Sequence, residues 1–374
     1  MVTELRRELG LIAGILTTAA FALFGKPWLA GLGVDLPTGA LFLWLFVVML
    51  WGSFGVVRHA DCLAIKLGEP YGTLILTLSV ISIEVTMIAT VMLTGSDNPT
   101  LGRDMMFAVI MIVLNGLIGL SIFIGGLRHL EQRHNLQGAR TFFTVLIPLA
   151  VLSLILPNYT DATAVGTYSR SQMLFLTLST MALYGAFLAI QTMRHSGYFV
   201  APAGSDDDTP EHAAVELHDH GDLVIRSIPF HGVMLVAYML PIVLLSKSMA
   251  KLIDFGIGGA GAPAALGGVL VAILVLAPEG LAAIEAAKSD RLQRSINICL
   301  GSGLATIGLT VPAILAISLV TGIPVVLGLA PAESVLLMLT LLVGAINASS
   351  ERTNIIQGLV HLILFAAYIV LIFD

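Results

Sequence analysis

The chain has 374 residues, of which 57% are hydrophobic and 11% charged, and its mean hydropathy is +0.96. This composition excludes a pair of soluble domains and is typical of a polytopic membrane protein. The net charge of −6 comes from one segment, because seven of the 24 acidic residues lie between Asp206 and Asp222 and the remaining 17 nearly balance 18 Lys and Arg, which leaves no basic surface for nucleic acid.

Eleven apolar runs are long enough to cross a bilayer as helices. The first follows Arg6 and Arg7 and contains Ala20-Phe21-Ala22, a pattern that also fits a cleaved signal peptide. We expect a retained helix, because a polytopic protein needs no removable signal. The predicted spans are residues 9–25, 39–57, 71–94, 105–126, 142–157, 173–193, 230–247, 263–285, 296–320, 332–349 and 356–373.

Lys and Arg concentrate in alternate loops, and this bias predicts the orientation. The N-terminus and the even-numbered loops hold 13 of these residues, and the other side holds five. We therefore expect a cytoplasmic N-terminus and, after eleven crossings of a bacterial inner membrane, a periplasmic C-terminus. The five residues on the periplasmic side are Lys26, Arg103, Arg170, Lys247 and Lys251.

A polar linker, residues 196–229, separates the sixth and seventh spans and is expected in the cytoplasm. It contains Ser205-Asp206-Asp207-Asp208 followed by His212, His218 and His220. One interpretation is a solvated, disordered charge run. The other is a segment that senses or attracts cations, since carboxylates and imidazoles are cation ligands. The two cysteines, Cys62 and Cys299, lie in or beside apolar segments, which predicts small core residues and no disulfide.

The linker divides the chain into an N-terminal extra helix (residues 1–38), a first five-helix set (39–195) and a second five-helix set (230–374). The second helix of each set carries a glutamate, Glu84 or Glu279, and the next helix carries Ile-Gly-Leu-Ser (118–121) or Ile-Gly-Leu-Thr (307–310). Because five is odd, the second set enters the membrane from the opposite side. The sequence therefore predicts an all-α membrane protein with two inverted five-helix repeats, the plan of many secondary transporters.

Glu84 and Glu279 are the acids placed well inside predicted spans, where a charge costs roughly 2.5–3.5 kcal/mol on insertion scales. No Lys or Arg lies at the same depth to compensate them. Two carboxylates held close in a low dielectric tend to take up protons, and a cation that replaces those protons leaves the total charge similar. This equivalence is the physical basis of cation/proton exchange, and it makes both glutamates candidate metal and proton ligands.

Further ligands must be neutral oxygens, because calcium takes six to eight oxygens at about 2.3–2.6 Å. Pro278 has no N–H to donate and Gly280 eases distortion, so carbonyls of Leu274 and Val275 are candidates. A hydroxyl can instead donate to its own helix, which is the alternative for each serine and threonine. The side-chain candidates are Ser82, Asn115, Ser302 and Thr306.

Four other polar residues have weaker functional interpretations. Glu69, before Pro70 at the cytoplasmic mouth of the third span, fits a helix cap or an ion vestibule. His231 and His361 lie in apolar spans and can relay protons, although a neutral histidine bonded to a neighbour explains them as well. Asn347 is expected to hydrogen-bond between helices.

These residues resemble the calcium/cation antiporter superfamily, and specifically its cation/proton exchanger branch with the bacterial calcium(sodium)/proton antiporters. The resemblance runs from about residue 55 to the C-terminus and is most specific in the second half. It implies that Glu84 and Glu279 are the two repeat acids and that Asn115 is the asparagine of the following helix. The stretches that carry it are residues 67–72 (LGEPYG), 278–283 (PEGLAA), 296–302 (INICLGS) and 311–312 (VP).

The chain has Val80-Ile81 and Val275-Leu276 where that family commonly has Gly-Asn before each acid, so fewer polar ligands are present. We therefore expect an antiporter, not an enzyme, that exports calcium, or sodium or potassium, in exchange for protons by alternating access. Its partners are inorganic cations, protons and the bilayer, with no cofactor and with a homo-oligomer left open. The alternatives are a proton-independent cation channel and a carrier for another cation such as manganese.

Overall fold

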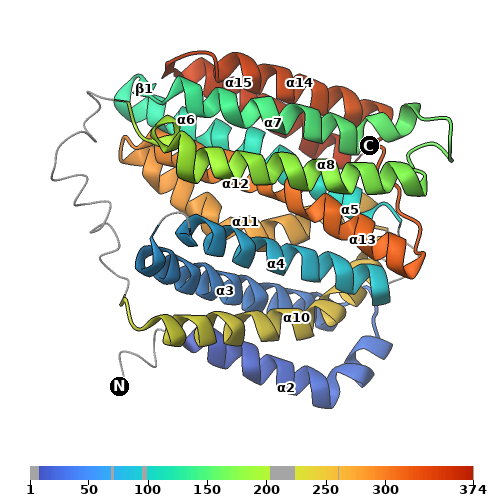
Figure 1. Cartoon of the computed structure of the whole chain (residues 1–374). Helices are drawn as coiled ribbons and strands as arrows, with labels where there is room; N and C mark the ends of the chain where they lie inside the picture. The colour runs from blue at the N-terminus through green and yellow to red at the C-terminus, as the bar shows by residue number, and fades with distance from the viewer. Residues whose placement is uncertain (1–7, 69–70, 95–98, 203–223, 260, 374) are drawn as a thin grey trace. The chain divides into compact units, whose positions relative to one another are not determined.

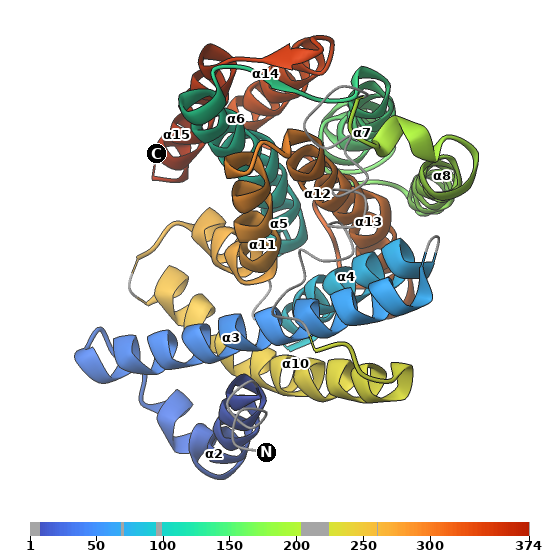
Figure 2. The ribbon, with the colours of Figure 1, turned by 90° about the vertical axis from the view of Figure 1, so that its left-hand side faces the viewer.

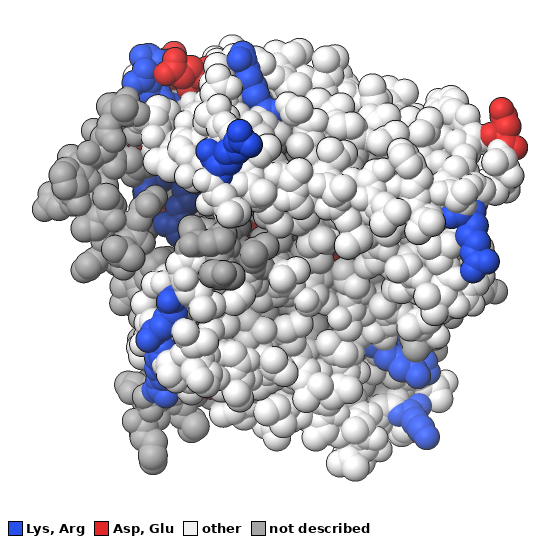
Figure 3. Space-filling view, in the orientation of Figure 1, with Lys and Arg blue, Asp and Glu red and all other residues white. Residues whose placement is uncertain are grey.

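The computed structural model describes residues 8–68, 71–94, 99–202, 224–259 and 261–373. In this part of the chain, nine helices are long and apolar enough to cross a membrane, and two shorter apolar helices lie at Thr77–Thr90 and Pro331–Asn347. Each of the eleven predicted spans overlaps one of these helices. The visible helix sides are largely free of charged side chains, which gather at helix ends (Figure 3). The protein is a multi-pass, almost entirely helical membrane protein.

Two helices are much longer than predicted. The second runs over Leu36–Leu67 and the seventh over Ile228–Gly258, so Arg58, Lys66 and Lys247, expected in loops, lie in helices. An apolar run in the sequence ends at the first charged residue, but the backbone hydrogen bonds of a helix can continue past that residue. Long basic side chains can lie along the helix with their charge in the interface, so the helix continues past the apolar run.

The chain divides into two compact units, of which the first comprises residues 1–101 and 222–278. Within it α2, α3 and α10 lie side by side, and α4 packs on α3 and α10 (Figures 1 and 2). Its elements are α2 (Leu9–Ala30), α3 (Leu36–Leu67), α4 (Tyr71–Thr94), α10 (Ile228–Gly258) and the part of α11 (Ala264–Lys288) that ends at Pro278.

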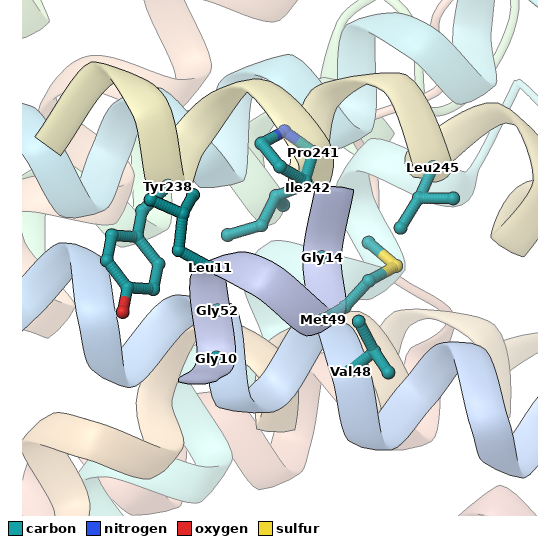
Figure 4. Close-up of a pocket in the computed structure, with 10 residues that line it drawn as sticks. All are labelled: Gly10, Leu11, Gly14, Val48, Met49, Gly52, Tyr238, Pro241, Ile242 and Leu245. Carbon is teal, nitrogen blue, oxygen red and sulfur yellow. The ribbon is translucent and has the colours of Figure 1, made fainter. Parts of the chain in front are cut away.

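Glycines bring the backbones of α2, α3 and α10 close together (Figure 4). A Cβ at Gly14 of α2 would meet Pro241 at 3.1 Å, and one at Gly52 of α3 would meet Ile242 at 3.3 Å. A Cβ at Gly55 would overlap the ring of Tyr238. Small residues permit this approach, which gains dispersion contacts where lipid supplies no hydrophobic driving force. The extra N-terminal helix is thereby joined to the first helix of each predicted set.

The second unit comprises residues 102–221 and 279–374. In Figure 2, α12 lies between α6 and α7, with which it is in contact. Its helices are α5 (Leu101–Ile110), η1 (Met111–Leu117), α6 (Ile118–His129), α7 (Leu136–Leu154), η2 (Leu156–Tyr159), α8 (Arg170–Ala189), η3 (Ile190–Arg194), η4 (Ser196–Phe199), the rest of α11, α12 (Leu292–Ala305), η6 (Thr306–Thr310), α13 (Val311–Thr321), α14 (Pro331–Asn347) and α15 (Ile355–Ile372).

Side-chain caps fix where several of these helices begin. Asn135 accepts from the first amides of α7, and capping boxes open α8 at Ser169 and α15 at Asn354. Each cap satisfies backbone N–H groups that a helix start leaves without partners. Before α7 and α15, strands β1 (Gln132–Arg133) and β2 (Arg352–Thr353) pair antiparallel, Gln132 opposite Thr353.

The two short repeated motifs mark close helix crossings. A Cβ at Gly119 of α6 would meet His361 Cβ of α15 at 2.8 Å, and one at Gly308 of η6 would meet the Tyr184 ring of α8 at 2.7 Å. The third helix of each predicted set therefore packs on the last helix of the other. Each third helix is also interrupted by a π-helical segment, η1 or η6. These correspondences favour an internal repeat, whose inverted arrangement stays a prediction.

Candidate functional site

Glu279 lies in α11 between Pro278 and Gly280, and the helix continues through the proline. Pro278 has no N–H, so the carbonyl of Leu274 cannot receive the usual bond from four residues ahead. Gly280 is buried, and a Cβ there would meet Leu117 of η1 at 2.9 Å. The missing side chain therefore lets the segment that carries Glu279 lie directly against the π-helical segment η1.

The face of α12 that carries Cys299 and Ser302, which Thr306 of η6 continues, lies near this carboxylate. Glu279 interacts electrostatically with Cys299. Ser302 and Thr306 follow at spacings of three and four residues, which place them on the same helix face as Cys299. All three are buried, and the neighbouring Gly303 lies against Val113 of η1. Glu279, Ser302 and Thr306, predicted from the sequence, thus belong to one unit and to adjoining helix segments.

Asn115, in η1, is fully buried and both ends of its amide are engaged. Its Nδ2 donates to Thr340 Oγ1 of α14 at 2.8 Å, and its Oδ1 lies 3.0 Å from His361 Nδ1 of α15. His361 Nε2 lies 3.0 Å from Asn347 Nδ2. Because Asn115 Oδ1 can only accept, His361 carries its proton on Nδ1 and accepts from Asn347 through Nε2. The arrangement fits a neutral, hydrogen-bonded His361, and it confirms the interhelical role of Asn347.

Glu84 lies in α4 of the other unit and is 1% exposed. Ser82, two residues before Glu84 on the same helix, donates its hydroxyl to the carbonyl of Leu78. Ser79 does the same with Ile75 at 2.6 Å. Both serines are therefore satisfied by their own helix, the alternative considered for each hydroxyl, and Ser82 as an ion ligand stays a prediction.

The remaining sequence candidates are placed as follows. The side chains of Leu274 and Val275 are buried in α11, and Glu69 lies outside the described residues. Glu285, later on the same helix, lies 3.4 Å from Lys288 with 71% of its side chain exposed. Within the described ranges no group of three or more His, Cys, Asp or Glu has a metal-binding arrangement.

Two neighbours of the site were not predicted from the sequence. Thr340 holds Asn115, and Cys299 faces Glu279 although it reads as a small core residue. Thr340 is a lone hydroxyl in the middle of an apolar helix, a signal that many threonines bonded to their own helix share. The spacing of Cys299, Ser302 and Thr306 could have indicated that Cys299 lies near the site, because it places the cysteine on the same helix face as two candidate ligands.

Comparison with known proteins identifies relatives of this chain. A family model described as sodium/calcium exchanger protein matches residues 38–193 and 230–373. The sodium-potassium/proton antiporter ChaA of Escherichia coli (strain K12) is 40% identical over 336 residues, 89% of each chain. A Ca(2+)/H(+) antiporter of Aphanothece halophytica is 23% identical over 68% of each chain.

The fold has solved counterparts. Two structures of YfkE, one of them described as a Ca2+/H+ antiporter protein, give TM-scores of 0.71 and 0.70 at 18% and 16% identity. They cover 98% and 96% of this chain and 98% and 99% of theirs. The family match extends over far more than half of the sequence, and the 40% identical relative is matched over 89% of this chain. The chain belongs to the sodium/calcium exchanger protein family.

Proposed function

We propose that this protein is a cation/proton antiporter that exports sodium or potassium, and calcium as a second substrate, from the cytoplasm in exchange for protons. The observation that carries the proposal is the buried carboxylate of Glu84, together with Glu279 held against η1 by Gly280. An anion at such depth requires a compensating cation or a proton. Exchange follows because a cation or a proton can each neutralise the carboxylate, whereas an ionised carboxylate with neither bound is costly.

The neutral groups around the carboxylates favour a monovalent ion over the calcium that the sequence alone puts first. Calcium takes six to eight oxygens. Apolar residues, Val80-Ile81 and Val275-Leu276, precede the two acids and offer no side-chain oxygen. Asn115 Oδ1 already accepts from His361 Nδ1. Fewer oxygens remain for a demanding divalent ion. The name of the 40% identical relative, a sodium-potassium/proton antiporter, also favours sodium or potassium over calcium as the main substrate.

Alternating access supplies the mechanism. A cation would displace protons from the carboxylates on the cytoplasmic side, and protons would displace the cation on the other. Both glutamates act as ligands, with Ser302, Thr306 and the carbonyls near Leu274 as neutral partners. We place the N-terminus in the cytoplasm of a bacterial inner membrane, following the bias of Lys and Arg among the loops.

Glu279→Gln tests the central role of the carboxylate. In inside-out vesicles with an imposed proton gradient, the variant should lower cation-driven proton release by roughly 100-fold, because loss of one partner of a buried ion pair costs about 3 kcal/mol. The measurement is the recovery of a pH-sensitive dye after addition of sodium, potassium, calcium or manganese. Glu84→Gln should give the same loss.

Glu285→Gln is the matched control, since it makes the same chemical change on the same helix at an exposed position paired with Lys288. It should transport like the unchanged protein. Normal transport by correctly inserted Glu279→Gln would contradict the proposal. Cation flux that persists without proton movement would identify a channel instead, and release by calcium alone or by manganese alone would reverse the proposed order of ions.

A further inference from the structure

A cavity of about 320 Å³ lies wholly within the first unit, where α3 begins, α10 ends and α11 begins (Figure 2). Neither of the two glutamates of the proposed exchange site is among the residues that line it, so the exchange mechanism leaves the cavity unexplained. Most of the lining side chains are apolar, and they include Phe42 of α3, Leu252 and Phe255 of α10 and Leu270 of α11.

The size and the lining of the cavity indicate what it can hold. Native interiors have few voids larger than a water molecule, so ordinary packing does not leave a space of this size. Its volume falls within the range of about 300–1,000 Å³ that small-molecule sites occupy. Water is a poor occupant, because each buried water needs roughly two to four polar partners and these walls offer few. The lining therefore favours an apolar or amphiphilic molecule.

Two glycines keep this space open. Gly39 of α3 and Gly256 of α10 both line the cavity, and no atom of the described residues lies within 4 Å of the position that a Cβ would occupy on either. Close packing therefore does not require a glycine here, in contrast to Gly14 and Gly52 of the same unit. A glycine inside a helix is destabilising relative to alanine. The missing side chains thus preserve the volume of the cavity at some cost to both helices.

The polar part of the lining lies at the start of α3. Asp35 caps this helix, with Oδ1 accepting from the backbone N–H of Thr38 at 3.0 Å. Hydrogen bonds from Thr38 hold the pKa of the Asp35 carboxyl below its ordinary value, so this exposed group is ionised at neutral pH. Lys251 is exposed on α10 four residues before Phe255, which places it on the same helix face at the edge of the cavity. A negative and a positive group thus border an apolar interior.

We propose that this cavity binds a phospholipid with an ethanolamine head group, whose acyl chain fills the apolar space while its ammonium meets Asp35 and its phosphate meets Lys251. Acyl chains are the apolar molecules that surround a membrane protein, so they are the occupant at highest concentration. Charge complementarity selects the head group, because Asp35 attracts an ammonium and repels a head that carries only negative charge. The bound chain contacts α3, α10 and α11 and braces their ends. This site does not depend on the proposed antiport.

Photo-cross-linking tests where the lipid binds. The full-length protein is reconstituted in vesicles that contain phosphatidylethanolamine with a diazirine at the end of one acyl chain, and the labelled peptides are identified by mass spectrometry. Residues 252–257 and 266–270 should carry the label. Gly256→Leu extends a side chain into the cavity and should lose most of this labelling, and Gly39→Leu should do the same from α3. Gly185→Leu on α8, where a Cβ also meets no described atom within 4 Å, is the matched control and should label like the unchanged protein.

Lipid titrations of the detergent-solubilised protein supply the second readout. Phosphatidylethanolamine should raise the melting temperature of the unchanged protein by about 3 °C and have little effect on Gly256→Leu, since a ligand stabilises the folded state that binds it. Phosphatidylethanolamine should bind about two- to fivefold more tightly than phosphatidylglycerol, which is the effect of one exposed ion pair. Asp35→Asn should remove this preference and keep the start of α3, because asparagine caps a helix as well as aspartate does.

Labelling of residues 252–257 to the same extent in Gly256→Leu, Gly39→Leu and the unchanged protein would overturn the lipid site. Labelling of the cavity by a photoreactive free fatty acid, but not by the phospholipid, would overturn the choice of occupant. Equal affinity of the unchanged protein for the two head groups would overturn the role of Asp35. Loss of labelling in both cavity variants, with Gly185→Leu unaffected, supports the site even in a protein that shows no antiport.

Discussion

His134 shows how burial alone sets the protonation of a side chain at a helix end. It lies between β1 and α7, is 2% exposed, and neither ring nitrogen has a hydrogen-bond partner among the described residues. Burial lowers the pKa of His134 to about 4, against a smaller opposing effect from Glu351. The structure therefore holds the neutral imidazole at neutral pH, because the hydration that a charged ring would lose outweighs its attraction to Glu351.

This pKa makes a prediction about stability. Between about pH 6.5, the ordinary pKa of a histidine, and about pH 4, the unfolded chain binds a proton at His134 that the folded chain does not. Stability should therefore fall as the pH drops through this window, by at most about 1.4 kcal/mol per pH unit. His134→Gln should flatten the dependence of the melting temperature of the detergent-solubilised protein on pH.

The control for that measurement is His195→Gln, which should leave the slope unchanged. A slope that stays the same in His134→Gln would mean that other groups produce the acid sensitivity.

At the scale of single helices, glycines decide which faces meet. Gly119 of α6 and Gly358 of α15 bring two backbones together, because a Cβ at Gly119 would meet Leu362 N at 3.2 Å as well as the His361 side chain. Backbone atoms cannot relieve such a contact by changing rotamer, as a flexible side chain can. The π-helical segments η1 and η6 are a second feature of this scale, since an extra residue in a turn shifts the faces that follow.

Gly119→Ala should lower the melting temperature, because α6 and α15 must separate and the network from Asn115 to His361 must shift with them. A loss of about 1–3 kcal/mol is expected from overpacking. Gly185→Ala on α8 is the matched control, since nothing lies within 4 Å of a Cβ there. It should be neutral or stabilising by up to about 1 kcal/mol from helix propensity. Equal melting temperatures for the two variants would argue against close packing at Gly119.

At the scale of the whole chain, the loops of the second unit meet in two groups. Gln132 Nε2 donates to Ala287 O at 2.9 Å, and β1 pairs with β2, so the loops before α7, α12 and α15 lie together. Leu327 N donates to Gly166 O at 2.8 Å, which joins the loops before α8 and α14. The counts of Lys and Arg had assigned the first group to the cytoplasm and the second to the periplasm.

Labelling tests that orientation. Thr163→Cys and Ser349→Cys place thiols on exposed residues, one in each group of loops. A membrane-impermeant maleimide applied to cells with a permeabilised outer membrane should label the cysteine at 163 and leave the one at 349 unlabelled. The unchanged protein is the blank, because Cys62 and Cys299 are buried. The reverse pattern would place the N-terminus in the periplasm.

The sequence by itself determined the membrane class, the approximate position of all eleven spans, the family and the two glutamates within the spans, of which Glu84 is buried. These features depend on hydrophobicity along the chain and on the cost of a charge in lipid, and both can be read from the linear sequence. It underestimated the length of α3 and α10, because charged residues near the interface end an apolar run without ending a helix.

Only the tertiary structure decided which polar groups find partners. Asn115 reads as an open ligand in the sequence but is held by Thr340 and His361, more than 200 residues away along the chain. His231 reads as an isolated imidazole in an apolar span, yet its Nδ1 lies 2.9 Å from Nδ1 of His59. Such pairs depend on which helix faces meet, and glycine contacts and π-helical segments set those faces without leaving a periodic signal in the sequence.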